Sequence, residues 1–126
     1  MLASLFVLGA INKIVNYGAT LSYMAGADVR PAVLLLPPVI ALELVAGLLI
    51  IRGGRLAVWA ALILVPYTLT TNVFFHDFWT MEEPVRALQL SLFFKNISIA
   101  GGLLVVAATI GHRDQKEARA RHLGEK

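Results

Sequence analysis

Apolar residues fill this chain in four long stretches, which are separated by short polar segments. The stretches cover residues 2–24, 32–51, 56–76 and 88–110. Each is close to the roughly 20 residues that a helix needs to cross a hydrocarbon layer about 30 Å thick. The third is the most uniform, because no residue from Leu56 to Phe75 is charged. The pattern predicts four membrane-spanning helices.

The first stretch is less uniform than the other three. Asn12, Lys13, Asn16 and Tyr17 interrupt it, and the part after Ile14 is amphipathic. Amphipathic helices favour the boundary between lipid and water. We therefore expect the outer end of the first helix to lie in the membrane interface.

Composition agrees with a membrane protein. Hydrophobic residues make up 58% of the 126 residues and charged residues only 15%. A soluble core of this size cannot bury so many apolar side chains, whereas helices that face lipid need no polar outer face. Short connections favour antiparallel neighbours. The predicted fold is all-α, a transmembrane four-helix antiparallel bundle over residues 1–111, followed by a charged cytoplasmic tail over residues 112–126.

Positive residues predict the orientation of the bundle. Arg52 and Arg55 lie in the second connection and five Lys or Arg residues lie in the tail, whereas the other connections hold only Arg30 and Arg86. Cytoplasmic loops carry an excess of Lys and Arg. Both termini of this multi-pass protein are therefore predicted to be cytoplasmic. The formal net charge of +3 follows from this topology and gives no reason to expect a nucleic-acid partner.

Several polar side chains fall at membrane depth. A charged side chain at the centre of a bilayer costs roughly 2.5–3.5 kcal/mol even on insertion scales, so such residues normally face the bundle interior and mark a functional site. We expect these residues to form one ligand-binding polar cluster: Lys13, Glu43, Asn72, His76, Lys95 and Asn96.

The helical rise gives the relative depth of these groups. Glu43 and Lys13 lie about 14 and 18 Å from the cytoplasmic ends of their helices, so we predict an ion pair between them. His76 and Lys95 lie further outward, which predicts a cavity that opens on the non-cytoplasmic side between the third and fourth helices. Each of these residues also has an interpretation without a ligand. Lys13 and Glu43 would then be a purely structural ion pair, the Lys95 side chain would extend to the membrane surface, and His76 would belong to the interfacial belt of polar and aromatic residues.

The chain contains no cysteine, which excludes thiolate catalysis, disulfide exchange and iron–sulfur ligation. His76 is the only histidine at membrane level, because His112 and His122 lie in the tail. We therefore predict no catalytic residue, no metal site and no cofactor that this chain binds alone.

Four segments together resemble one known family, the DoxX family of small four-helix membrane proteins. They are residues 6–14 (FVLGAINKI), 42–53 (LELVAGLLIIRG), 75–79 (FHDFW) and 94–104 (FKNISIAGGLL). The resemblance covers nearly the whole chain. It implies an inner-membrane protein associated with oxidoreductase systems, since family members include a subunit of a thiosulfate:quinone oxidoreductase and membrane partners of sulfur and superoxide enzymes.

Three functions are compatible with these observations. The first is a membrane subunit of a redox complex, non-catalytic in itself, whose polar cluster binds a quinone or another lipophile with a polar head while a partner redox protein supplies the electron carrier. The second is an assembly factor or chaperone for a membrane complex. The third is a small transporter in which Glu43 exchanges protons and substrate. The sequence leaves the ligand, the partner and the oligomeric state open.

Overall fold

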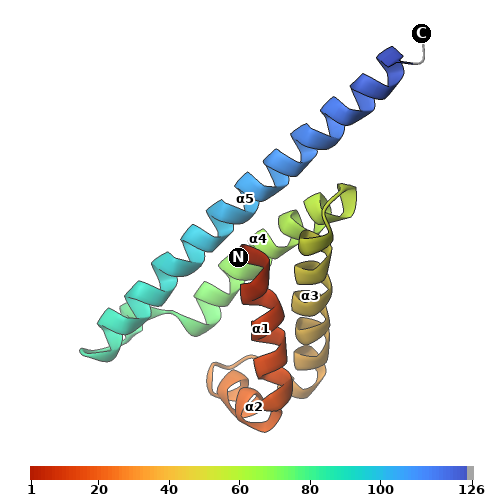
Figure 1. The fold of residues 1–126 in the computed structure, drawn as a ribbon. Helices are drawn as coiled ribbons and strands as arrows, with labels where there is room; N and C mark the ends of the chain where they lie inside the picture. The colour runs from red at the N-terminus through yellow and green to blue at the C-terminus, as the bar shows by residue number, and fades with distance from the viewer. Residues whose placement is uncertain (125–126) are drawn as a thin grey trace.

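A computed structural model describes residues 1–124 and consists of helices joined by short connections (Figure 1). Three of the helices are long and apolar enough to cross a membrane, and a bent pair forms a fourth candidate span. The elements are α1 (Leu2–Val15), α2 (Tyr17–Gly26), α3 (Ala32–Arg52), α4 (Arg55–Phe75), the short 3₁₀ helix η1 (Phe78–Thr80) and α5 (Val85–Gly124). The all-α bundle predicted from the sequence is confirmed.

The first predicted span, residues 2–24, is not one continuous helix but is broken in two. α1 ends at Val15, α2 begins at Tyr17, and the chain bends by 99° between them. Asn16 has a non-helical backbone, and its side-chain amide donates to the carbonyl oxygen and to the Oδ1 of Asn12. Short amide side chains compete with helical hydrogen bonding in this way. The bend carries α2 across one end of the bundle (Figure 1).

The bundle contains two pairs of neighbouring helices, α1 with α3 and α4 with α5 (Figure 1). α1 and α3 approach closely at Gly47, where an added Cβ atom would lie 2.7 Å from Val7 Cγ2 and 3.2 Å from the carbonyl oxygen of Ala3. Small residues allow this kind of approach in membrane helices. The buried core follows the same rule, since alanines dominate it: Phe6, Ala46, Ala60, Ala61, Leu64, Leu103 and Ala107.

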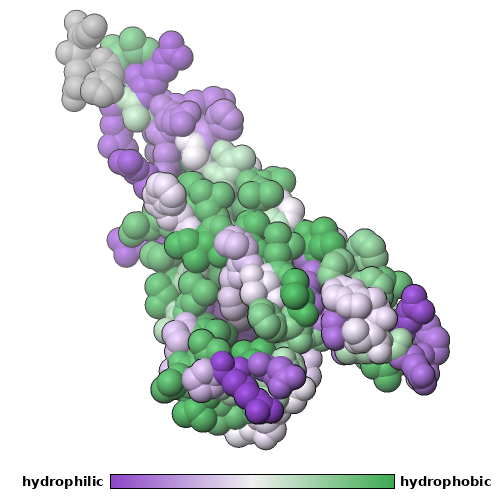
Figure 2. Space-filling model, turned by 180° about the vertical axis from the view of Figure 1, so that it is seen from behind, coloured by the Kyte–Doolittle hydropathy of each residue, from purple (hydrophilic) through white to green (hydrophobic). Residues whose placement is uncertain are grey.

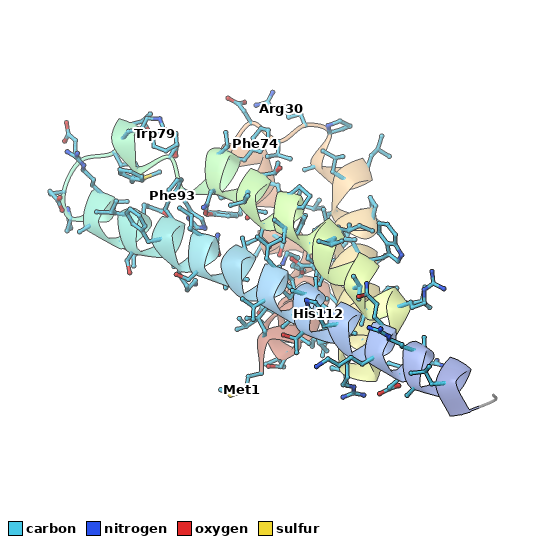
Figure 3. All side chains as sticks on the ribbon, turned by 90° about the horizontal axis from the view of Figure 1, so that it is seen from above. Met1, Arg30, Phe74, Trp79, Phe93 and His112 are labelled. Carbon is cyan, nitrogen blue, oxygen red and sulfur yellow. The ribbon has the colours of Figure 1, made fainter. Side chains whose placement is uncertain are left out.

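Aromatic side chains join η1 to α5 at one end of the α4–α5 pair. Phe78 packs edge to face against Trp79 and Phe93, with ring centroids 5.2 and 5.3 Å apart. The ring centroids of Trp79 and Phe93 are also 6.2 Å apart (Figure 3). Edge-to-face pairs stabilise beyond the area that they bury. These contacts hold together the end of the pair that carries His76.

The outer surface is apolar along the body of the bundle. Figure 2 shows hydrophobic side chains over much of the body of the bundle and hydrophilic ones gathered at its extremities, one of which is the C-terminal end of α5. In the most apolar 18-residue segment of each long span, the buried share is only 22% for α3, 33% for the span that begins with α4 and 17% for α5. An apolar surface this extensive is typical of helices that face lipid.

α5 is longer than the predicted fourth span of residues 88–110, because the tail continues the same helix through residue 124. Arg113 and Glu117 pair across one turn at 3.4 Å on its exposed surface. Mixed charges at this spacing support a solvated helix.

The connection between α3 and α4 consists of two glycines. Gly53 and Gly54 both adopt a φ of 79°, a conformation that residues with a side chain disfavour.

Candidate functional site

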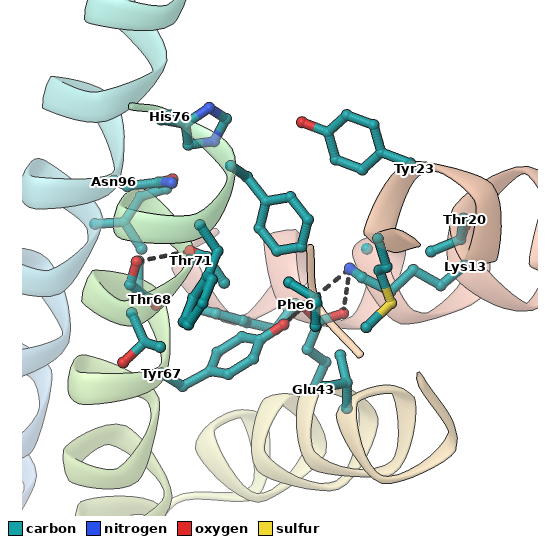
Figure 4. Close-up of a pocket in the computed structure, with 18 of the residues that line it drawn as sticks. Phe6, Lys13, Thr20, Tyr23, Glu43, Tyr67, Thr68, Thr71, His76 and Asn96 are labelled. Carbon is teal, nitrogen blue, oxygen red and sulfur yellow. Dashed lines mark hydrogen bonds and ion pairs between the residues drawn. The ribbon is translucent and has the colours of Figure 1, made fainter. Parts of the chain in front are cut away.

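A cavity of about 740 Å³ lies between the α1–α3 pair and the α4–α5 pair, with α2 contributing to its wall (Figure 4). Because α4 and α5 pack against each other, the cavity lies on their side facing α1 and α3. α4 and α5, the third and fourth predicted spans, thus both line the cavity, but α1, α2 and α3 form the rest of its wall. The predicted opening on the non-cytoplasmic side stays a prediction. Much of its wall is apolar, with Phe6, Leu35, Val39, Phe74 and Ile99 among the lining residues.

Lys13 and Glu43 form the predicted ion pair inside this cavity. The Lys13 ammonium donates to both carboxylate oxygens of Glu43, at 2.9 Å to Oε1 and 2.7 Å to Oε2. The Glu43 side chain is 7% exposed and that of Lys13 is 26% exposed. The predicted pairing of Lys13 on α1 with Glu43 on α3 is thus confirmed. The opposite charge of each residue compensates for the hydration that the other loses on burial.

Tyr67 completes this group from α4, because its hydroxyl donates to Glu43 Oε1 (Figure 4). Gly9 lies beside the ion pair, since an added Cβ there would be 3.4 Å from Glu43 Oε2 and 3.7 Å from Lys13 Nζ. The sequence analysis missed Tyr67, because it stands in an apolar stretch and is uncharged. The helical rise could have identified it: Tyr67 lies about 18 Å from Arg55, the same depth as Lys13.

Asn72 and Asn96 form a second polar group, between α4 and α5. Asn96 donates to Asn72 Oδ1 at 2.9 Å, and Asn72 donates to the carbonyl oxygen of Phe93 at 3.1 Å. Asn96 lines the cavity, whereas Asn72 is buried behind it and is not one of the described lining residues. Asn72 therefore positions Asn96 and joins the two helices.

His76 and Lys95 line the same cavity. His76 Nδ1 lies 2.7 Å from Gln89 Oε1, which fixes the ring against α5. Figure 4 shows His76 and Tyr23 at one end of the cavity and Glu43 towards the other. Tyr23 on α2 stacks on Phe75, with ring centroids 5.2 Å apart. Five of the six residues predicted for the polar cluster thus line one cavity, and among these five only Lys13 and Glu43 are bonded to each other.

Thr68 is a further polar residue that the sequence analysis missed. It lines the cavity, is 4% exposed, and its hydroxyl has no hydrogen-bond partner among residues 1–124. Thr71, one turn further along α4, donates to the carbonyl oxygen of Thr68 at 2.7 Å. No pattern in the sequence distinguishes Thr68 from Thr70 and Thr71, because all three lie in one short threonine-rich segment of α4.

The chemistry available in the cavity is hydrogen bonding and electrostatics. Among the described residues, no group of three or more His, Cys, Asp or Glu side chains is placed to hold a metal ion. Ammonium, hydroxyl, imidazole and amide groups converge on an apolar space, which is the arrangement of a site for a small ligand with a polar head.

Comparison with known proteins identifies the family. The DoxX family model matches residues 1–77, more than half of the chain. The chain belongs to the DoxX family. Two inner membrane proteins of Escherichia coli K12 are similar to this DoxX protein: YphA, 30% identical, and YqjF, 37% identical. Each alignment covers 83% of this chain, with 74% of YphA and 75% of YqjF. No solved structure matches the chain.

The family match covers only part of the cavity in this DoxX protein. Residues 1–77 contain α1 to α4, and with them Lys13, Glu43 and Tyr67. Lys95 and Asn96 lie on α5, beyond the matched residues. The apolar helices and the relatives named as inner membrane proteins together show a membrane protein of the DoxX family.

Proposed function

We propose that this DoxX protein is a membrane subunit of a redox complex and binds a quinone, or another small lipophile with a polar head, in the cavity between its helix pairs. The observation that carries the proposal is the cavity itself: about 740 Å³ of largely apolar space whose wall also contains the polar residues Lys13, Tyr67, Lys95 and Asn96. Ligand sites of this size are typically apolar, with a few placed polar groups.

A quinone suits both parts of this cavity. Its ring and apolar chain would contact the aromatic and aliphatic wall, and its carbonyl oxygens would accept hydrogen bonds from ammonium, hydroxyl or amide donors. Leu5, Leu35 and Phe74 line the cavity and are also exposed, which supports entry of a lipophile from the lipid phase.

Electron transfer belongs to a partner in this proposal. The chain supplies no cysteine for an iron–sulfur cluster, and its polar groups bind and orient a head group without exchanging electrons. The partner is a redox protein that carries a flavin, haem or cluster. We further propose a location in the inner membrane with both termini cytoplasmic, which is supported by the positive residues of the α3–α4 connection and of the α5 end.

The test is native mass spectrometry of the gently solubilised protein, followed by lipid extraction. We expect a co-purified lipophile of the quinone class and a partner that contains an electron carrier. Saturable binding of a decyl-substituted benzoquinone to the purified protein, measured through Trp fluorescence, would support the proposal. An extract without any quinone-class lipid, together with no binding of the added quinone, would overturn it.

The closed Lys13–Glu43–Tyr67 group favours a second candidate, an assembly factor for a membrane complex. In that function the polar group only fixes the bundle, and the partner binds elsewhere. Recovery of one partner complex with no lipophile in the cavity would favour this candidate over the first.

A further inference from the structure

We infer that the cavity selects a lipophile with an anionic head, a carboxylate or a phosphate, and that the Lys95 ammonium on α5 binds this head. The inference rests on the proposed function in its wider form, a lipophile with a polar head, and deepens it, because it assigns the charge of the head and the residue that holds it. It starts from the charges in the cavity wall.

These charges do not cancel. The Lys, Arg, Asp and Glu residues that line the cavity are Lys13, Glu43 and Lys95. Lys13 gives two of its three hydrogens to Glu43, and the same carboxylate also accepts from Tyr67. Lys95 makes no ion pair with any residue from 1 to 124. A largely apolar wall thus carries one positive charge that the described residues do not compensate.

The helices around Lys95 offer it no carboxylate at its own depth. Residues 85–111 of α5 contain no Asp or Glu, and Asp114 lies about 28 Å further along the helix. On α4, no residue from Leu56 to Phe75 is charged. Glu43 stands on α3, which is not a neighbour of α5 among the described residues. Because an uncompensated charge at membrane depth is costly, an anion from outside the chain would stabilise Lys95.

The ion pair offers an anionic head much less than Lys95 does. A head group at Lys13 would have to replace the charge-assisted bonds of Glu43 and would meet the negative charge of that carboxylate. Lys95 can give its ammonium hydrogens without breaking an ion pair, and its side chain is exposed, so a ligand in the cavity can reach it.

The rest of the cavity suits the apolar chain of such a ligand. Its wall includes Leu5, Phe6, Val39, Phe74 and Ile99, which would contact the chain while the head stays at α5. Hydrogen bonds between two charged groups are roughly twice as strong as those between neutral ones. An ionised head therefore gains more at Lys95 than a neutral head on the same chain.

The test compares ligands that share one chain and differ in the charge of the head. Decanoate, decyl phosphate and the neutral decanol are titrated into the full chain in non-ionic detergent by calorimetry, with titrations into detergent alone subtracted. We expect the wild type to bind at least one of the two anions about 10-fold or more tightly than decanol. Tighter decanoate would identify a carboxylate head, and tighter decyl phosphate a phosphate head.

Variants on α5 assign this preference to one residue. Lys95→Met keeps a long side chain and removes the charge, so we expect it to bind the preferred anion about 10- to 100-fold more weakly and decanol as well as the wild type does. Lys95→Arg keeps the charge and should retain most of the affinity. Arg86→Met is the matched control, because it removes a positive charge of the same helix that does not line the cavity, and it should bind like the wild type.

The outcomes separate this inference from the proposed function. Wild-type binding of both anions no tighter than that of decanol would overturn the inference. Wild-type affinity for the anion in Lys95→Met would also overturn it and would show that the side chain extends to the membrane surface instead. Equal losses in Lys95→Met and Arg86→Met would do the same, because they indicate attraction to net charge alone.

In each of these cases a site that binds decanol or the decyl-substituted benzoquinone would stand. Anion binding that depends on Lys95, without binding of the benzoquinone, would overturn the quinone as ligand and support the inference. Absence of binding of every one of these ligands to the wild-type protein would overturn both.

Discussion

At the scale of single residues, the Lys13–Glu43 pair determines which substitutions inside the bundle lower its stability. Both carboxylate oxygens of Glu43 are bonded to Lys13, and Oε1 also accepts from Tyr67. Loss of one partner leaves the other charge in an apolar interior, whereas loss of both leaves no charge there. The two residues should therefore act on stability as one unit.

We predict that Glu43→Ala lowers the free energy of unfolding in detergent by about 3 kcal/mol, near the lower end of the usual cost of breaking a buried pair, because Lys13 keeps 26% of its side chain exposed. Adding Lys13→Met should recover a large part of that loss. A double-mutant cycle on thermal or denaturant unfolding measures the coupling. Strictly additive losses would show that the pair does not act as a unit.

At the scale of helices, close approach at Gly47 sets how α1 packs on α3. An added Cβ there would meet Val7 Cγ2 at 2.7 Å and the carbonyl oxygen of Ala3 at 3.2 Å. We predict that Gly47→Ala destabilises the bundle by roughly 1–3 kcal/mol, the usual effect of overpacking. Val7→Ala in the same chain should restore part of the loss, because it removes the nearer contact.

Gly101 on α5 is the matched control for this prediction. An added Cβ at that position meets nothing within 4 Å, so Gly101→Ala should leave the unfolding temperature unchanged or raise it. Equal losses for Gly47→Ala and Gly101→Ala would argue against the close packing of α1 on α3.

The connection between α3 and α4 carries a different constraint. Gly53 and Gly54 have φ angles of 79° with ψ angles of −171° and −173°, a region that is essentially restricted to glycine. We predict that Gly53→Ala and Gly54→Ala each lower stability by about 1–3 kcal/mol. Gly111→Ala in α5, which meets no close atom, serves as the control in the same thermal unfolding assay. Normal stability of both connection variants would contradict the backbone conformation.

At the scale of the whole molecule, the arrangement of the helices predicts which segments face each side of the membrane. The α3–α4 connection and the C-terminal end of α5 lie towards one side of the bundle, and α2 and the α4–α5 connection towards the other (Figure 1). The absence of cysteine allows single cysteines to report this arrangement without background. Asp28 and Arg119 are suitable positions, because both are exposed.

We predict that Asp28→Cys reacts with a membrane-impermeant maleimide added outside spheroplasts, and that Arg119→Cys reacts only after permeabilisation. His76→Cys, at the end of the cavity, should also react from outside, whereas Leu62→Cys, in the lipid-facing body of α4, should not. Labelling of Arg119→Cys in intact spheroplasts would reverse the orientation of the bundle.

Much of this architecture could be predicted from the sequence, because it depends on local composition and helical geometry. Stretches of about 20 apolar residues require a membrane, and the constant rise of a helix gives the depth of Lys13 and Glu43 closely enough to pair them. The same reasoning brought Asn96, His76 and Lys95 near one site. The polar residues around Asn16 indicated an irregularity in the first helix, but they could not predict the angle of the bend.

Only the tertiary structure decided which side chains face one another, because depth along a helix says nothing of the helix's rotation or of its crossing with its neighbours. These set the cavity on the α1–α3 side of α4 and α5, turned Asn72 away from it, and brought the uncharged Tyr67 and Thr68 into its wall. The sequence by itself determined a membrane bundle with a polar interior. The packing of small residues between helix pairs decided where that interior is open and which groups within it are already bonded.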